Sequence, residues 1–288
     1  MPSHAARRPQ LKREDAISNV ENVRAVERAF RILQAINTRS GTTAQEIAQS
    51  TTIPRATVYR LLETMEQMKL IVRDRLSKKW RVALHAKSLS SGFREADWVC
   101  QIVIPKMVNL GKQILWPVDL MVLQDDEMEI RESTNYLSPY ALDRGMVGAR
   151  LPIIDTASGR AFLAFAPEAE SQKVLNGLAV KYRTDVPSVT RDGPLKTVLQ
   201  QCRELGVGFR KQGFRVDTMS ISAPVYLNDS VMACMTIIWL SSALKFEDAV
   251  TMYRDRLLEM AQDISSEIAK LSTQELHEDG QRIGGFPN

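Results

Sequence analysis

The feature that most constrains the fold is a change of apolar period within the first 84 residues. Apolar side chains recur at steps of three and four in residues 23–36, 44–48 and 58–65, as they do along one face of an α-helix. Two short apolar runs follow at 70–73 and 80–84, as expected for strands joined by a polar turn. The pattern predicts three helices followed by a hairpin.

Local signals predict where these helices begin and end. Gly41 breaks the first helix, and Thr42 or Thr43 can cap the second, because Glu46 stands at capping-box distance from Thr43. Pro54 suits the first turn of the third helix, where a missing N–H costs no hydrogen bond. A short helix, a tight turn, a second helix and a hairpin make a winged helix-turn-helix.

The third helix separates an apolar side from a polar side. At 100° per residue its apolar stripe contains Val58, Leu61, Leu62 and Met65, which leaves the opposite side for another molecule. In a winged helix-turn-helix, the start of this helix can lie against base edges in the major groove, while the hairpin tip lies over the DNA backbone or minor groove. The expected DNA-binding residues are Thr43, Arg55, Ala56, Thr57, Tyr59, Arg60, Lys78 and Lys79.

The charges of the chain are divided unevenly along its length. Residues 1–82 hold 16 Lys and Arg against 8 Asp and Glu, whereas the remainder holds 22 against 26. A basic segment of this kind is attracted to a polyanion, to nucleic acid first and to a membrane surface second. Arginine can bond phosphate or guanine, which favours DNA. The alternative is a helical protein-interaction module whose arginines are only solvated.

The rest of the chain alternates between helical and strand periods, which predicts an α+β domain with an antiparallel sheet. Asn228 and Asp229 form a favourable hairpin turn, and Asp155 or Thr156 can cap a short buried helix. Helices are expected at 99–115, 158–166, 168–178, 194–205 and 246–271. Strands are expected at 119–124, 128–132, 219–227 and 231–239.

These patterns predict a division into five segments. Residues 1–19 are basic and polar without an apolar period, so they are expected to form a flexible arm. The winged helix-turn-helix is expected over 20–84 and a linker helix over 85–97. The α+β domain is expected over 98–273, followed by a flexible tail over 274–288.

Six stretches of the sequence resemble a single known family, and they occur in the order expected for it: residues 23–33, 43–48, 53–62, 148–152, 156–164 and 220–225. The first three are similar to the DNA-binding half of the IclR family of bacterial transcription regulators. The last three are similar to the GAF-like effector-binding domain of that family. Residues 116–119, 130–134 and 144–148 look most like MhpR-type regulators of aromatic-acid catabolism.

The resemblance implies a homodimer or tetramer that binds double-stranded DNA at a palindromic promoter site. It also implies that the second domain senses a small-molecule carboxylate and that the protein controls a catabolic operon. The likeness to MhpR-type regulators favours activation in response to an aromatic acid. A repressor of the same class that senses a small aliphatic acid is the alternative.

The resemblance also implies where the effector binds, on the sheet face and the loop around a glycine motif. Backbone N–H groups near Gly145 and Gly148 can bind a carboxylate, and Arg144 or Arg131 can supply a forked contact. A Met or Val on a strand is more often a core residue than a pocket residue, and Trp116 can instead pack between the domains. The expected effector-binding residues are Trp116, Asp119, Leu142, Arg144, Met146, Val147, Gly148, Leu151, Met219, Pro224, Thr236 and Ile238. In this family, pockets for small oxoacids tend to use serines or a cysteine on the late strands. The corresponding residues here are Pro224, Thr236 and Ile238, which favours a larger, more apolar ligand.

Catalysis is the least favoured function. The histidines are His4, His85 and His277, and none is placed to activate a Ser or Cys nucleophile in the second domain. We expect no catalytic residue, no cofactor and no metal site, because the chain lacks a phosphate loop, a dinucleotide fingerprint and metal-ligand spacing. Cys234 is expected to be an inert core thiol, and the acidic run 125–127 a solvated turn more often than a cation site.

The sequence also predicts a cytoplasmic protein that does not bind membranes as its function. The most apolar run, residues 231–240, is about half as long as the roughly 20 residues that a spanning helix needs. The first residues lack the apolar core of a secretory signal.

Overall fold

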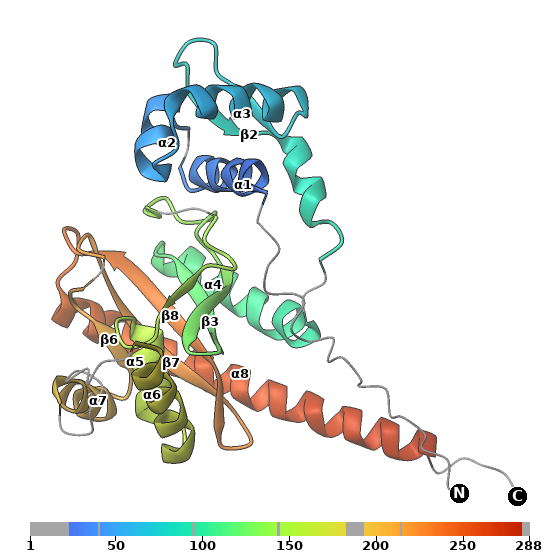
Figure 1. Ribbon diagram of the computed structural model, residues 1–288. Helices are drawn as coiled ribbons and strands as arrows, with labels where there is room; N and C mark the ends of the chain where they lie inside the picture. The colour runs from blue at the N-terminus through green and yellow to red at the C-terminus, as the bar shows by residue number, and fades with distance from the viewer. Residues whose placement is uncertain are drawn as a thin grey trace, which may run out of the picture. The chain divides into compact units, whose positions relative to one another are not determined.

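The computed structural model describes residues 23–39, 41–93, 96–142, 145–182, 193–213 and 215–283, with side chains described through Leu271. The chain divides into two compact units, Met1–Ser90 and Ser91–Asn288, which are drawn together in Figure 1. Among the described residues, no helix combines the length and the apolar character needed to cross a membrane.

The first unit is a winged helix-turn-helix, as predicted. Its core joins Ile32 and Ile36 from the first helix to Ile47, Val58 and Trp80 from the segments that follow, and all five side chains are buried. Thr42 pairs with Trp80 across an isolated antiparallel bridge, so the chain before the second helix is attached to the hairpin. The elements are α1 (Arg24–Asn37), α2 (Ala44–Thr51), α3 (Arg55–Gln67), β1 (Ile71–Arg73) and β2 (Trp80–Val82).

The start of α2 is the predicted capping box. The backbone N–H of Glu46 donates to Oγ1 of Thr43 at 3.3 Å, and the N–H of Thr43 donates to Oε2 of Glu46 at 2.7 Å. The hydrogen bonds from Thr43 lower the pKa of Glu46 below its usual value, because they stabilise the ionised form. The box satisfies two N–H groups that helix formation leaves unpaired, so it determines where α2 begins.

The end of the first unit differs from the prediction of one linker helix over 85–97. A 3-10 helix, η1 (Leu84–Ser90), stands there instead. The hydroxyl groups of Ser88 and Ser90 donate to backbone carbonyls three residues earlier, a competition that disfavours a regular α-helix. Gly92 follows and lowers the helix propensity further.

The second unit begins with a helix that has a π-helical first part, η2 (Val99–Val103), and continues as α4 (Ile104–Ile114). The N–H of Ile104 bonds to the carbonyl of Val99, five residues back. Pro105 explains the wider turn, because it has no N–H to offer to the carbonyl four residues before it.

The sheet of the second unit has six antiparallel strands in the order β5-β4-β3-β8-β7-β6 (Figure 1). The two edge strands were not predicted, because three residues are too few to show an alternation. Asn228 and Asp229 have φ of 50° and 65° in the hairpin turn between β7 and β8, as their residue types suggest. The strands are β3 (Val118–Gln124), β4 (Glu127–Ser133), β5 (Arg150–Pro152), β6 (Gly208–Arg210), β7 (Thr218–Leu227) and β8 (Ser230–Leu240).

The two faces of this sheet pack against different helices. One face, which includes Leu120, Ile221 and Trp239, shares a core with α4 and α8 (Phe246–Ile283). The other face, which includes Met121 and Cys234, packs against α5 (Ala157–Phe165), α6 (Glu168–Tyr182) and α7 (Pro194–Leu205), as Figure 1 shows. This is the predicted α+β domain.

The last helix is longer than the predicted 246–271. Its buried residues include Tyr253, Leu257 and Ile264, which follow the predicted apolar period. Beyond Leu271 the sequence is mostly polar, so no apolar period marked the continuation of α8 to Ile283. Part of the segment 274–288, predicted to be a flexible tail, therefore belongs to this helix.

Candidate DNA-binding surface and ligand cavity

The exposed side of α3 carries the predicted DNA-contacting residues. Arg55, Ala56 and Arg60 are exposed, whereas Thr57 and Tyr59 are half-buried on the flanks of the same side. They occupy this side because the apolar stripe of α3 faces the core of the first unit. Short and basic side chains therefore meet on the N-terminal half of one exposed helix, as major-groove recognition requires.

Two of these residues, Arg55 and Tyr59, contact each other. Nη2 of Arg55 donates to the hydroxyl of Tyr59 at 3.4 Å, and the guanidinium lies 5.7 Å from the centre of the Tyr59 ring. The contact lies one helical turn along α3, where residues four apart are neighbours. It orients the arginine without neutralising its charge, so the charge stays available to a phosphate or a base.

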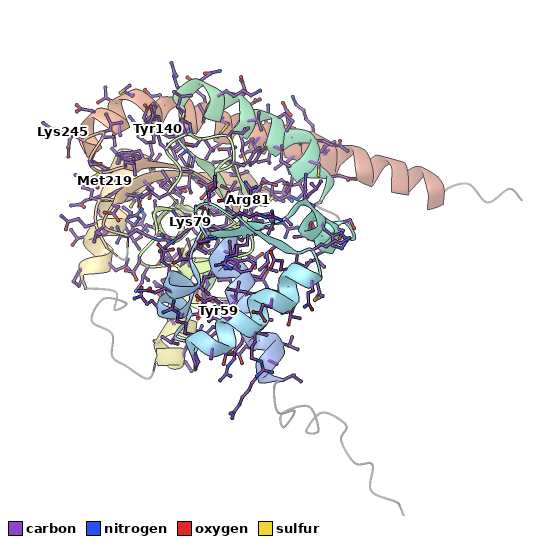
Figure 2. All side chains as sticks on the ribbon, turned by 90° about the horizontal axis from the view of Figure 1, so that it is seen from above. Tyr59, Lys79, Arg81, Tyr140, Met219 and Lys245 are labelled. Carbon is purple, nitrogen blue, oxygen red and sulfur yellow. The ribbon has the colours of Figure 1, made fainter. Side chains whose placement is uncertain are left out.

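The turn at the tip of the hairpin is stabilised by hydrogen bonds to the side chain of Asp74. Asp74 Oδ1 accepts hydrogen bonds from the N–H groups of Leu76 at 3.0 Å and Ser77 at 2.8 Å. The bonds from Ser77 and Leu76 lower the pKa of Asp74, because they favour its ionised form. Lys78, with φ of 58°, and Lys79 are both exposed on this turn. Figure 2 labels Lys79 and Arg81 on the hairpin and Tyr59 on α3.

Thr43, which was expected to contact DNA, also has a structural role as the N-cap of α2. Its hydroxyl donates to Oε2 of Glu46 at 2.9 Å and accepts the Glu46 N–H in the capping box. A contact from Thr43 to DNA stays a prediction.

A cavity of about 100 Å³ lies in the second unit, against the sheet face that carries α5. It is covered by residues of the loop before β5 and by the first turn of α5, where Thr156 caps the helix by accepting the N–H of Gly159 at 3.0 Å. Half of the predicted effector-binding residues line it, namely Asp119, Leu142, Met146, Leu151, Thr236 and Ile238.

The other predicted effector-binding residues lie elsewhere. Trp116 belongs to the opposite core, where its indole N–H donates to the hydroxyl of Tyr253 at 3.2 Å, and Met219 packs against the same core. Pro224 is buried along β7 opposite Cys234, further along the strand than the cavity. Val147 is 55% exposed.

The glycine loop differs in one further respect from the expectation. The N–H of Gly148 donates to the carbonyl of Ile130 at 2.7 Å, so it is used within the protein rather than offered to a carboxylate. Arg144, the remaining predicted residue, lies outside the residues that the structure describes. Arg131 does not line the cavity, because its neighbour Ile130 does and adjacent strand residues point to opposite faces.

One end of the cavity contains a buried carboxyl group. Asp119 is 2% exposed, and Oγ of Ser133 donates to its Oδ1 at 2.6 Å. Burial raises the pKa of Asp119 to about 7, and the nearby charge of Glu132 adds to the rise while the Ser133 bond opposes it. Thr236 stands opposite Asp119 in the ladder and shares a 2.9 Å hydrogen bond with Ser222.

The other end contains residues that the sequence did not single out. Arg210 of β6 lines the cavity although it is only 4% exposed, together with Arg215, Thr218 and Ser220. The alternation of Ser220 and Ser222 with Ile221 in β7 was the available signal, because it marks one polar face along the strand. The Arg210 position had no such signal, since β6 has three residues.

The buried carboxyl predicts a pH dependence of stability. The pKa of Asp119 is higher in the folded state, about 7, than the ordinary 3.8. Its contribution to stability is therefore full below about pH 4 and is lost as the pH rises to about 7, at about 1.4 kcal/mol per pH unit. Between pH 5.5 and 7.0, the free energy of unfolding of the wild type should fall by about 2 kcal/mol more than that of Asp119→Asn.

Urea titrations of both proteins at the two pH values measure this difference. Asp255→Asn, which changes an exposed carboxylate beside Arg254, is the control and should track the wild type. Parallel pH profiles for the wild type and Asp119→Asn would contradict the assignment.

Two other candidate functional groups, the acidic turn 125–127 and Cys234, have structural explanations. Asp125 bonds to Arg150 at 3.1 Å, and Asp126 bonds to Lys181 at 2.9 Å, so this acidic turn is paired with cations of the chain. Burial raises the pKa of Cys234 to about 12, which keeps it a thiol at neutral pH. Across the described ranges, no group of three or more His, Cys, Asp or Glu could hold a metal ion.

Comparison with known families and proteins agrees with both units. The model of the IclR helix-turn-helix domain matches residues 25–75, and that of the bacterial transcriptional regulator IclR C-terminal domain matches residues 98–266. The transcriptional repressor IclR of Escherichia coli K12 is 25% identical over 228 residues, covering 78% of this chain and 82% of that protein. The HTH-type transcriptional regulator KdgR of the same organism is 26% identical over 208 residues, covering 72% and 78%.

A solved structure shows the same fold. The crystal structure of the Thermotoga maritima IclR aligns with a TM-score of 0.54 at 20% identity, covering 86% of this chain and 100% of that one.

Proposed function

Since the chain belongs to the IclR family of bacterial transcription regulators, we propose that it controls a catabolic operon in response to an aromatic or related small carboxylic acid. One observation carries the proposal: exposed arginines lie on α3 of the first unit, and a cavity with charged and apolar groups lies in the second unit. The protein acts as a sensor rather than an enzyme, and in the cytoplasm, where promoter DNA is found. The likeness to MhpR-type regulators favours activation.

The lining of the cavity supports an aromatic ligand. Between its polar ends the wall is formed by Met121, Ile130, Leu142, Met146 and Ile238, which offer apolar contact area. Tyr140 also lines it, and an aromatic side chain favours stacked or edge-to-face contacts with a ring. Sites of this composition typically bind a largely apolar ligand and orient it with a few polar groups.

The surface of α1 supports a homodimer or a larger oligomer. Val26 and Phe30, four residues apart on one face of the helix, are 52% and 59% exposed, and Val23 at the N-cap is 68% exposed. Exposed apolar groups gathered on one face favour an interface, and a second copy provides a matching one by symmetry. Two helix-turn-helix units related by a two-fold axis fit a palindromic site.

The experiment that tests the proposal is a gel-shift titration of the full chain against the promoter region upstream of its own gene. We expect specific binding whose affinity falls steeply as salt rises, because several phosphate contacts release counterions. Sedimentation of the free protein measures its oligomeric state. Binding no tighter than to a scrambled duplex would contradict the DNA-binding role.

A thermal-shift panel of aromatic and aliphatic acids tests the sensing role, because a ligand at 100 times its Kd stabilises a protein by about 2.7 kcal/mol. A shift with aromatic acids is expected. A shift with small aliphatic acids alone would replace the aromatic assignment, and a promoter reporter in the presence of the bound acid decides between activation and repression.

A further inference from the structure

The tip of the hairpin in the first unit carries an apolar side chain that the fold does not cover. Leu76 is 95% exposed, the largest exposed fraction among the large apolar side chains that the structure describes. It stands in the turn between β1 and β2, a position where glycine, proline, asparagine, aspartate and serine are the usual residues. An exposed leucine is common by itself, so its surroundings decide what it can bind.

The backbone around Leu76 is fixed by hydrogen bonds within the turn. Oδ1 of Asp74 accepts the N–H of Leu76 at 3.0 Å and the hydroxyl of Ser77 at 2.9 Å. The N–H of Lys78 donates to the carbonyl of Asp74 at 3.0 Å, and the N–H of Asp74 donates to the carbonyl of Lys79 at 2.9 Å. A partner that contacts Leu76 therefore pays little further conformational entropy to order the loop.

Cations flank the leucine on both strands of the hairpin. Residues 73–81 contain five Lys and Arg and one acidic residue, Asp74, which is engaged by the bonds of the turn. An apolar tip among positive charges fits a polyanion whose interior is apolar, and stacked base pairs between two phosphate backbones have this character. The five cations are all exposed, namely Arg73, Arg75, Lys78, Lys79 and Arg81.

The tip projects on the side of the first unit where α3 is exposed. Figure 1 shows the loop between β1 and β2 extending past α3, on the side away from α1. The helix and the hairpin share one core, in which Val58 and Leu62 of α3 pack with Trp80 of β2. When α3 lies in the major groove, a hairpin beside it reaches the adjacent minor groove. The leucine is therefore continuous with the expected DNA-binding surface.

A leucine in the minor groove acts on the shape of DNA. Its side chain has no hydrogen-bond donor or acceptor, so it cannot recognise base edges as Arg60 on α3 can. Apolar side chains that enter the minor groove insert between base pairs, partly unstack them and kink the duplex. Unstacking is easiest at pyrimidine–purine steps such as TA and CA, so insertion favours a site that contains such a step.

We propose that Leu76 is a wedge that inserts between two base pairs in the minor groove and makes the protein selective for a flexible step beside each half-site. The inference rests on the proposed function, since it adds a specificity-determining residue to the DNA-binding unit. It divides the work of the hairpin, because the cations contact phosphates while Leu76 responds to the deformability of the sequence. Specificity then arises at a step where no side chain bonds to a base.

Permanganate footprinting of the full chain on the promoter duplex upstream of its own gene tests the insertion, because permanganate oxidises unstacked thymines. The wild type should make a thymine at one pyrimidine–purine step beside each half-site at least fivefold more reactive than in the free duplex. Leu76→Ser should abolish this reactivity, and Leu76→Met, which keeps an apolar side chain of similar length, should retain it. Leu76 is exposed, so both variants should unfold in urea as the wild type does.

Gel shifts at several salt concentrations separate the wedge from a charge contact. Leu76→Ser should bind the promoter duplex at least fivefold less tightly than the wild type, yet keep its salt slope and its affinity for a scrambled duplex, because it removes no charge. Replacing the reactive step by AA should weaken the wild type at least fivefold and Leu76→Ser less than twofold. Val180→Ser, which changes a 79% exposed apolar side chain on α6, is the control and should bind as the wild type does.

The outcomes distinguish this inference from the proposed function. Specific binding by the wild type without reactive thymines, or with reactive thymines that persist in Leu76→Ser, would overturn the wedge and leave the DNA-binding role in place. An absence of specific binding by the wild type would overturn both. If Leu76→Ser binds the promoter duplex as the wild type does but loses binding to vesicles that contain anionic lipid, the tip contacts a membrane surface and the proposal is wrong.

Discussion

Arg60→Ala is expected to weaken binding to the specific promoter site by about 2–6 kcal/mol. An arginine that reads a base contributes about 1–3 kcal/mol, and the two copies in a dimer on a palindromic site double the effect. Arg60 is exposed on α3, so the loss follows from the interface and not from the fold. Competitive gel shifts with specific and scrambled duplexes measure both affinities.

The controls separate base reading from general charge. Gln67→Ala changes an exposed side chain at the far end of the same helix and should leave both affinities within twofold of the wild type. Lys79→Ala on the hairpin should weaken specific and scrambled binding about equally and reduce the salt slope, as a phosphate contact does. A specific affinity of Arg60→Ala equal to that of the wild type would remove Arg60 from the interface.

Gly159→Ala is expected to destabilise the second unit by about 3 kcal/mol or more. A Cβ on Gly159 would overlap the backbone carbonyl of Ile153 and stand 2.6 Å from its Cα, and backbone atoms cannot rotate away as a side chain can. A Cβ on Gly208 of β6 would similarly overlap backbone atoms of Ala157 and Ala161. The two glycines therefore let α5 lie directly on the chain around it.

Urea unfolding followed by tryptophan fluorescence measures this effect, because Trp116 and Trp239 are buried in the second unit. Gly177→Ala is the matched control, since no atom lies within 4 Å of its added Cβ and alanine is the better helix former. It should leave stability unchanged or raise it by up to about 1 kcal/mol. A Gly159→Ala protein as stable as this control would show that α5 can move aside without cost.

A displaced α5 should also affect ligand binding. Its N-cap Thr156 and its first two residues, Ala157 and Ser158, line the cavity. Gly159→Ala is therefore expected to lose affinity for aromatic acids even under conditions where the protein remains folded.

Much of the fold could be predicted because its signals are local. The capping box of Thr43 and Glu46, Pro54 before α3, and the turn at Asn228 and Asp229 each involve residues a few positions apart. The exposure of Arg55 and Arg60 followed from the helical period alone. The segment 84–97 was less predictable. Its serine side chains bond to nearby backbone carbonyls and so oppose an α-helix, and the differences in helix propensity that decide the outcome are less than about 1 kcal/mol per residue.

The cavity was harder to predict because it depends on strand register. Met219 and Ser220 are neighbours in the chain, yet the first packs with α8 and the second lines the cavity. A shift of one residue exchanges the two faces of a strand. An error of one position in the predicted register therefore moves a side chain from the ligand cavity to the core. Figure 2 labels both Met219, which was expected at the effector site but packs in the opposite core, and Tyr140, which was not expected there but lines the cavity.

By itself, the sequence determined the two-part organisation, the basic recognition unit and the polar side of its third helix, since these depend on composition and on periods within one helix. Only the tertiary structure decided which charges share a cavity. Asp119 on β3 and Arg210 on β6 are separated by 91 positions in the chain and by the two strands β8 and β7 in the sheet. Their meeting depends on the order of the strands, which is set by packing between distant segments and leaves no local pattern for a reader of the sequence to detect.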